Sequence, residues 1–514
     1  MLILKKKYMY VAGSFLAGFS VMVVELVSGR IVAPIIGSSV FTWTSVIGTT
    51  LLGLALGSYL GGKIADNTTT DKSLPLSFLT SSVLVALIPI LSIHTDFIVN
   101  SYDSILILNL FMSLYLFLFP ALAIGAIQPI ILKKYALDFS KIGSEYGILS
   151  SVWSTGGIIG VFLTGFFFIS TIGSRETIWL MAIILFLTGL IFATRDKKII
   201  ACFIFVLFFF LIIFFSFGIK EPNPNILFQK ETNYYDAKVI KGYLPQYGET
   251  KFLVLDADFH SIEYPTKAEY YPEMYPVFGN LKEDIKNIMI IGSGAYTMPK
   301  KFKDYYKDSS VSVVEIDPEM INISNDFFNL KKYDIKTIIG DAKIALDKKG
   351  GKYDVIFGDA YNSFISVPWY LITKEWNDSI KNRLNDNGIY AINFISALQG
   401  EKSFLFKSIL KTFKISFPDF YVFTFREDKK NTQNIVILGI KDGKHEDKKL
   451  LKEKLKVGEN SFLANKLILD ENLGEDDGTI LTDNFSPVEK LMNPAVKSYL
   501  PKNLFELREI LSSK

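Results

Sequence analysis

Seven long apolar runs within the first 220 residues constrain this chain more than any other feature. Each run approaches or exceeds the ~20 residues that a helix needs to cross the hydrocarbon core of a bilayer. The first run is too long, and too weakly flanked by a cleavage site, for a removable signal peptide. We therefore predict a polytopic, multi-pass helical domain in the cell membrane over residues 1–220. Its runs cover residues 8–28, 39–61, 77–95, 104–132, 147–170, 176–194 and 199–218.

Composition divides the chain at the same place. Hydrophobic residues make up 49% of the 514 residues, which is more than a soluble globular protein normally needs, and charged residues crowd the part after about Gly218. The formal net charge of +3 is too small to indicate nucleic-acid binding, so no nucleic acid is expected as a partner. The single cysteine excludes a disulfide within the chain, and the three histidines are too scattered to suggest a zinc site, so no metal is expected.

Basic residues between the apolar runs bear on the orientation. The groups at 5–7, 63, 133–141 and 195–198 fall on one side, which the positive-inside rule makes cytoplasmic. Seven spans would place the chain after Gly218 outside, whereas a nucleotide-type cofactor is made in the cytosol. We expect a cytoplasmic soluble part, although the span count points outward; a re-entrant or interfacial span would reconcile the two. SYLGGKIADN, which ends the second run, resembles a cytoplasmic loop of major-facilitator transporters, so the bundle is expected to be half-transporter-like.

The part after residue 220 predicts two further domains. EPNPN at 221–225 is a turn-rich linker, and short alternating segments follow it, so residues 221–280 are expected to form a linker and a small β-sheet domain. Apolar strands then alternate with segments that can hold helices over residues 281–500, which is typical of a doubly wound, Rossmann-like α/β sheet. The strands are predicted at Asn287–Ile291, Ser310–Glu315, Ile335–Ile339, Tyr353–Gly358 and Gly388–Phe394.

Glycines and acids follow four successive strands of this sheet. Gly292-Ser293-Gly294 follows the first strand and permits a tight turn and close approach of a ligand to the backbone. Glu315 ends the second strand, where a carboxylate can accept hydrogen bonds from ribose hydroxyls. Asp341 and Asp359 follow the third and fourth strands. Each acid alone could be a helix N-cap, but their succession at the ligand-binding edge favours an adenosyl site.

The motifs in this region resemble those of a known family. IMIIGSGAYTMPKKF, VVEIDPEM, GDAKIAL, YDVIFGDAYNSF and LTDNFSPVEKLM are similar to motifs of the spermidine synthases (aminopropyltransferases), and of their membrane-fused relatives in particular. The resemblance covers roughly residues 230–495. It implies a small β domain, a class I methyltransferase-like Rossmann domain, and decarboxylated S-adenosylmethionine as the co-substrate of a transferase. It also implies a small amine or polyamine-like substrate, association with the lipid bilayer, and a possible homodimer through the soluble domain.

The resemblance implies three groups of site residues. The catalytic group is Asp359, Tyr361 and Asn362. The cofactor-binding group is Gly292, Ser293, Gly294, Glu315, Ile316, Asp341, Ala342 and His260. The substrate-binding group is Tyr271, Glu273, Tyr296 and Trp369.

This chain departs from the family pattern at four places. Ala295-Tyr296 stands where the family's first loop has an acid, and Pro272 replaces a histidine. Asn362 replaces a second acid, and His260 a glutamine. A polyamine site needs several carboxylates, so the acceptor stays open. Aromatic side chains, Tyr296 and Trp369 with Tyr370, are candidates for a wall around a cation or a larger apolar acceptor; packing of the loop is the alternative.

Three functions remain in competition. The leading one is a membrane-anchored aminopropyltransferase that makes a polyamine-type product. The second uses S-adenosylmethionine itself for methyl transfer or other sulfonium chemistry on a membrane-delivered acceptor. The third belongs to another class: a non-catalytic adenosyl-binding domain that regulates a half-transporter.

Overall fold

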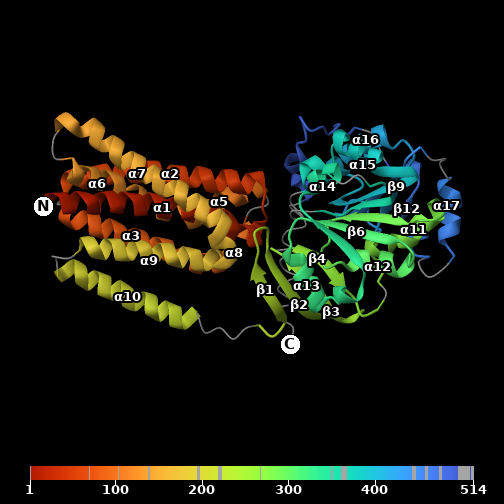
Figure 1. Cartoon of the computed structure of the whole chain (residues 1–514), viewed down its shortest axis with the longest axis horizontal. Coiled ribbons are helices and arrows are strands. Elements are labelled where there is room, and N and C mark those ends of the chain that lie inside the picture. The colour runs from red at the N-terminus through yellow and green to blue at the C-terminus, as the bar shows by residue number, and fades with distance from the viewer. Residues whose placement is uncertain are drawn as a thin grey trace. The chain divides into compact units, whose positions relative to one another are not determined.

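The structure is a computed structural model and divides into two compact units. One unit contains residues 1–223 with 231–233, and the other contains residues 224–230 with 234–514. Within them the residues described are 2–68, 70–101, 104–136, 139–193, 197–217, 223–256, 258–266, 268–348, 351–360, 367–442, 447–457, 461–473, 477–495 and 510. Figure 1 colours the first unit from red to yellow and most of the second from green to blue.

The first unit is a bundle of long helices. These are α1 (Leu2–Ile36), α2 (Val40–Asn67), α3 (Thr70–Leu91), α5 (Ile105–Gly125) continued by α6 (Ile127–Tyr135), α7 (Ile142–Leu163), α9 (Ser174–Phe192) and α10 (Lys197–Phe217), with short helices α4 (Asp96–Ser101) and α8 (Ile169–Thr171) between them. Six helical segments are long and apolar enough to cross a bilayer within the described part of the chain, and they coincide with the first six predicted runs. The seventh run corresponds to α10, whose side chains are described only to Leu207. The span count and membrane insertion therefore stay predictions.

Glycines allow the helices of this unit to approach one another closely. A Cβ at Gly57 of α2 would lie against the carbonyl oxygen of Leu122 in α5, and one at Gly61 against Ala126. Gly156 of α7 likewise faces the backbone of α1 at Phe15. Small residues on facing helices are the usual means of close packing in apolar surroundings. These glycines therefore pack the bundle.

A four-stranded sheet begins the second unit. Its strands are β1 (Ile226–Glu231), β2 (Asp236–Leu244), β3 (Gly248–Leu255) and β4 (Asp258–Glu263), in the order β1-β2-β3-β4. Alternate side chains point to opposite faces of a strand. Leu253 and its neighbours on one face pack against Met320 and Phe328 of the larger domain, while Phe252 and Val254 pack on the other face.

The larger domain contains an eight-stranded sheet in the order β12-β10-β11-β9-β8-β5-β6-β7. Four strands match the predicted bounds: β5 (Asn287–Ile291), β6 (Ser310–Glu315), β7 (Ile335–Ile339) and β8 (Tyr353–Gly358). The fifth predicted strand lies within the longer β9 (Leu384–Ser396), and three strands follow: β10 (Phe420–Thr424), β11 (Gln433–Ile440) and β12 (Leu467–Ile468). The neighbouring strands from β7 through β6, β5 and β8 to β9 pair in parallel. The pairs β9–β11 and β10–β11 are antiparallel. This is a Rossmann-like, methyltransferase-type topology.

Helices cover both faces of this sheet. Figure 1 shows α14, α15 and α16 along one side, and α11 and α12 along the other. The helices of the domain are α11 (Tyr275–Leu281), α12 (Thr297–Tyr305), α13 (Glu319–Phe327), α14 (Ala342–Lys348), α15 (Lys374–Arg383), α16 (Phe404–Ser416), α17 (Lys448–Leu455) and α18 (Leu463–Lys466). Because β5 pairs with β6 on one side and β8 on the other, the chain order changes direction between β5 and β8. Ligands of such sheets bind in the crevice at that point.

Candidate active site

The loop after β5 lies directly against the loop after β8. The backbone N–H of Asp359 donates to the carbonyl of Ile291 over 2.8 Å. Gly292 has a φ of +90°, and a Cβ there would collide with the carbonyl oxygen of Asp359. Only glycine meets both requirements without strain. The predicted glycine loop is therefore joined to the predicted catalytic acid.

Tyr296 lies in the core and not in a cavity wall. Its φ of +57° is in the left-handed region, it is 0% exposed, and its hydroxyl lies 2.7 Å from Thr337 Oγ1. Ala295 is equally buried, and its N–H donates to Ser261 Oγ. A large apolar ring at this position gains more from packing than from facing a cavity. The structure therefore gives Tyr296 no place in an aromatic wall around a substrate.

A small cavity of about 70 Å³, here called the Glu315 cavity, lies at the ends of β5, β6 and β7. Its walls include all eight predicted cofactor-binding residues: Gly292, Ser293, Gly294, Glu315, Ile316, Asp341, Ala342 and His260. Tyr235 and Tyr370, which the sequence did not assign to this group, also line it. The structure thus gathers residues spread over more than eighty positions into one cavity.

Glu315 already accepts three hydrogen bonds. Its carboxylate accepts from the N–H of Ser293 at 2.9 Å, from the hydroxyl of Ser293 at 2.5 Å and from the N–H of Asp317 at 2.9 Å. Burial raises the pKa of Glu315, and these hydrogen bonds oppose that rise. The carboxylate is held at the end of β6, where it can accept from ligand hydroxyls.

Asp341 forms hydrogen bonds with both of its carboxylate oxygens. One carboxylate oxygen caps α14 by accepting from the N–H groups of Lys343 and Ile344. The other accepts from the hydroxyl of Tyr370 over 2.7 Å. Asp341 and Tyr370 both line the Glu315 cavity, so this carboxylate lies where the sequence predicts a ligand contact.

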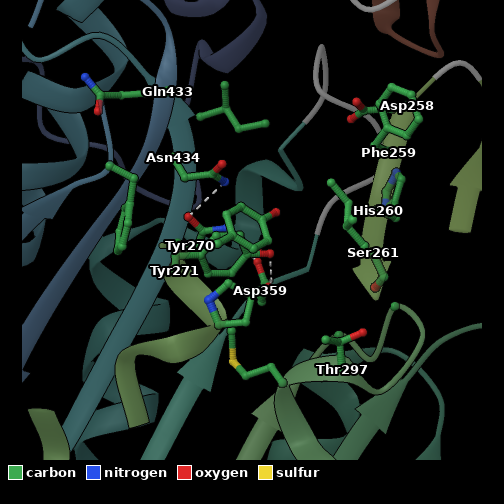
Figure 2. A pocket seen from close by; sticks show the side chains of 18 of the residues that line it. Asp258, Phe259, His260, Ser261, Tyr270, Tyr271, Thr297, Asp359, Gln433 and Asn434 are labelled. Atoms are coloured by element: carbon green, nitrogen blue, oxygen red, sulfur yellow. Dashed lines mark hydrogen bonds between the residues drawn. The ribbon is translucent and has the colours of Figure 1, made fainter. Parts of the chain in front are cut away.

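A second cavity of about 320 Å³, here called the Asp359 cavity, adjoins the first. The two share Asp359, His260, Gly292, Ser293 and Gly294 in their walls. Figure 2 shows Asp359 in the middle of this cavity, with Tyr270 and Tyr271 beside it and the β4 residues Asp258–Ser261 on the opposite wall. The size is at the lower end of the ~300–1,000 Å³ typical of small-molecule sites.

Asp359 is a partly buried acid in the wall that the two cavities share. The hydroxyl of Tyr271 donates to one of its oxygens over 2.9 Å, and the side-chain amide of Asn393 donates to the other over 2.7 Å. Burial raises the pKa of Asp359 to about 6, although these two hydrogen bonds favour its charged form. Burial and the adjacent Asp359 charge raise the pKa of Tyr271 well above its ordinary value, so the hydroxyl stays a donor. Asp359 is therefore a fixed carboxylate that titrates near the range in which a general base works best.

His260 lies in the wall between the cavities as a neutral ring. Burial lowers its pKa to about 4. Its Nε2 atom is enclosed and has no hydrogen-bond partner among the residues that the structure describes. A buried imidazole without a partner is costly, which makes this nitrogen a candidate for a ligand contact after local adjustment.

The remaining predicted site residues are distributed differently. Glu273 is buried, forms an ion pair with Lys301 and lines neither cavity. Trp369 is 43% exposed, packs edge-on against Tyr370 and also lines neither. The two other predicted catalytic residues, Tyr361 and Asn362, lie outside the described residues.

Several residues of the Asp359 cavity were not predicted from the sequence. Asn393 is a polar residue inside the apolar strand β9, and this interruption was the available signal. Its amide oxygen lies 3.3 Å from Asn434 Nδ2, which extends the network to β11. Further charged residues are Asp258 on β4, Glu269 before the 3₁₀ turn that holds Tyr271, and Arg426 after β10. Among the described residues no group of three or more His, Cys, Asp or Glu side chains could hold a metal ion.

Comparison with known proteins identifies the domain. The family model described as "Spermine/spermidine synthase domain" matches residues 269–444. The polyamine aminopropyltransferase of Vibrio vulnificus (strain CMCP6) is 29% identical over 171 residues, which cover 32% of this chain and 55% of that protein. The chain therefore spans about half the length of that relative.

Two further relatives match different lengths of this chain. Polyamine aminopropyltransferase 2 of Aquifex aeolicus (strain VF5) is 24% identical over 425 residues, covering 78% of this chain and 81% of that protein, so this match extends into the helical unit. The eEF1A lysine and N-terminal methyltransferase of Xenopus laevis is 28% identical over 132 residues, covering 24% of this chain and 19% of that protein. The C-terminal region of this chain thus contains a spermine/spermidine synthase domain of the aminopropyltransferase type.

Proposed function

We propose that this protein transfers an aminopropyl group from decarboxylated S-adenosylmethionine to an amine acceptor. The observation that carries the proposal is Asp359, a partly buried carboxylate held by Tyr271 and Asn393 between two adjoining cavities. The relatives named polyamine aminopropyltransferase support this reaction class.

The Glu315 cavity fits the adenosyl part of the donor. Gly292 and Gly294 line the cavity without contributing a side chain, and the Ser293 hydroxyl between them donates to Glu315. Glu315 offers a carboxylate for ribose hydroxyls, and Asp341 offers one for an adenine amino group. When bound, the donor supplies a sulfonium whose adjacent carbon is open to attack by an amine.

The residues around Asp359 prepare the acceptor for that attack. An amine reacts only in its neutral form, so Asp359 accepts a proton from the acceptor nitrogen. As the new N–C bond forms, the C–S bond breaks and the sulfur keeps the electron pair. Tyr271 and Asn393 hold the carboxylate in one orientation, which contributes through positioning. A catalytic role for Tyr361 and Asn362 stays a prediction, because both lie outside the described residues.

A second candidate is a transfer from S-adenosylmethionine itself. The loop after β5 favours it, because the acid that the family carries in this loop is absent from residues 292–296 here. The match to a named methyltransferase agrees with this alternative.

Calorimetry on the full chain in micelles separates the two candidates. Tighter binding of decarboxylated S-adenosylmethionine than of S-adenosylmethionine supports aminopropyl transfer; the reverse order favours the second candidate. Methylthioadenosine, the product expected from the donor, should also bind. If none of the three ligands binds, both candidate functions are wrong.

Replacement of Asp359 tests its catalytic role. Asp359→Asn should keep donor binding and lower turnover by about 10²–10⁴-fold, the usual contribution of a general base. The control is Asp386→Asn, because the Asp386 side chain is 98% exposed and lies on β9 outside both cavities. Unchanged turnover in Asp359→Asn with intact donor binding would favour a non-catalytic binding domain.

The helical unit is proposed to anchor the enzyme in the membrane with residues 224–514 in the cytoplasm. Six spans return the chain to the side on which the basic N-terminus lies; α10 would then lie at the interface. The test is an impermeant thiol label on Lys430→Cys in a Cys202→Ser background. Labelling only after cell lysis is expected, and labelling of intact cells would place this region outside. Homodimerisation stays a prediction.

A further inference from the structure

The Asp359 cavity continues into a third cavity on its outer side. This cavity, here called the Lys466 cavity, has a volume of about 530 Å³. Both cavities have Glu269 and Arg426 in their walls, so they meet at this pair of residues. An acceptor whose reacting end lies at Asp359 therefore has room to extend past Arg426.

The charge of the walls reverses along this path. The charged residues of the Asp359 cavity are three acids and one cation: Asp258, Glu269, Asp359 and Arg426. Those of the Lys466 cavity are three cations and two acids: Arg426, Lys429, Lys466, Glu269 and Glu427. Walls of one sign attract ligand groups of the opposite sign. The inner end of the path therefore favours a cation and the outer end an anion.

Arg426 lies where the acidic Asp359 cavity meets the more basic Lys466 cavity. Its backbone N–H donates to Gln433 Oε1 over 2.6 Å, which fixes the chain at this point. The guanidinium itself has no hydrogen bond or ion pair to any residue that the structure describes. Lys466, in contrast, lies 3.9 Å from Glu269. A guanidinium presents a planar set of donors that suits carboxylates and phosphates.

We propose that the acceptor is an amine that carries a phosphate or carboxylate at its far end, and that Arg426 binds this anionic group. The inference rests on the proposed transfer reaction and names its acceptor class. The amine lies at Asp359 and loses its proton there; the anionic group takes no part in the bond changes. The second ammonium of a simple diamine would instead approach a wall in which three cations outnumber two acids, which disfavours it.

The test compares acceptors of similar length on the full chain in micelles. The probes are 1,4-diaminobutane, 4-aminobutyrate and O-phosphoethanolamine, with phosphatidylethanolamine vesicles to detect a lipid source of the same chemistry. With decarboxylated S-adenosylmethionine, release of methylthioadenosine is measured. We expect KM for the preferred anionic amine to be about tenfold or more below that for the diamine, as one charge-assisted contact provides. The identity of that probe distinguishes phosphate, carboxylate and lipid.

Two variants at Arg426 and one control sharpen the test. Arg426→Gln should raise KM for the anionic amine by about tenfold, and Arg426→Glu should raise it further while lowering KM for the diamine. The control is Lys449→Glu, a charge reversal at an exposed lysine of α17 that lines neither cavity. It should change neither KM. A diamine preference that is unaltered in both Arg426 variants would overturn the inference.

Binding without turnover separates this inference from the proposed reaction. The full chain loaded with methylthioadenosine is titrated calorimetrically with O-phosphoethanolamine and 4-aminobutyrate. Binding that weakens about tenfold in Arg426→Gln supports the anion subsite even where no probe is turned over, and the transfer reaction alone then fails. Absence of Arg426-dependent binding for both probes overturns the inference, whether or not a diamine is turned over.

Discussion

The Glu315 and Asp359 cavities share a wall but are built in different ways. The Glu315 cavity is small, and its acids already accept hydrogen bonds from Ser293, Asp317 and Tyr370. The Asp359 cavity is larger, and β4, β9, β11 and the segment before α11 all contribute to it. The Glu315 cavity suits one ligand with fixed contacts. In the Asp359 cavity, substitutions in any of several segments could alter which acceptor is bound.

A change of pH should distinguish the two cavities most strongly, because it should affect the reaction through Asp359. Because Asp359 must be ionised to accept a proton and burial raises its pKa to about 6, kcat/KM for the acceptor should fall about tenfold per pH unit below 6. By pH 4 the loss should be about a hundredfold. The fall is measured as kcat/KM for the acceptor at saturating donor, which removes the effect of pH on donor binding. A flat profile between pH 7 and 4 would mean that Asp359 is not the base.

Glu315→Gln should weaken binding of the donor and leave the KM for the acceptor unchanged. Loss of a charged acceptor of ligand hydroxyl groups costs about 2 kcal/mol, or about thirtyfold in donor Kd. Calorimetry with methylthioadenosine gives the donor Kd, and steady-state kinetics gives the acceptor KM. An equal rise in both would show that the two cavities act as one site.

Tyr271→Phe should lower kcat about tenfold through its effect on Asp359. The variant removes one of two donors that orient Asp359, and that donor favours the charged carboxylate, so the acid limb of the pH profile should move upward. Donor Kd should not change. A lower kcat with an unmoved acid limb would assign Tyr271 a role in packing and not in positioning.

Tyr296→Phe should have the smallest effect and touch neither cavity. It removes a hydrogen bond to Thr337 in the core, which costs about 1 kcal/mol of the free energy of unfolding. Thermal melting of the full chain in micelles should show a slightly lower midpoint, with kcat and both ligand affinities unchanged. A changed acceptor KM would return Tyr296 to the group of substrate-binding residues.

The difference in construction also explains which parts could be predicted from the sequence. The Glu315 cavity was predictable because each of its motifs directly follows one strand of a regular strand–helix alternation, and parallel strands bring their ends to one edge. The Asp359 cavity was not, because Asn393 lies on β9 and Arg426 follows β10, and the strand order β9-β11-β10 departs from chain order. Tyr296 was misplaced for another reason: no local pattern shows whether a side chain after a glycine loop faces the ligand or the core.

Gly292 has a consequence for any attempt to change the donor. Because no side-chain atom separates it from the carbonyl of Asp359, the loop after β5 and the backbone of the proposed base are in direct contact. A donor that displaces the loop is expected to displace Asp359 as well, so the reaction itself would report whether the donor fits. Redesign of donor selectivity should therefore begin at Glu315 and leave this contact intact.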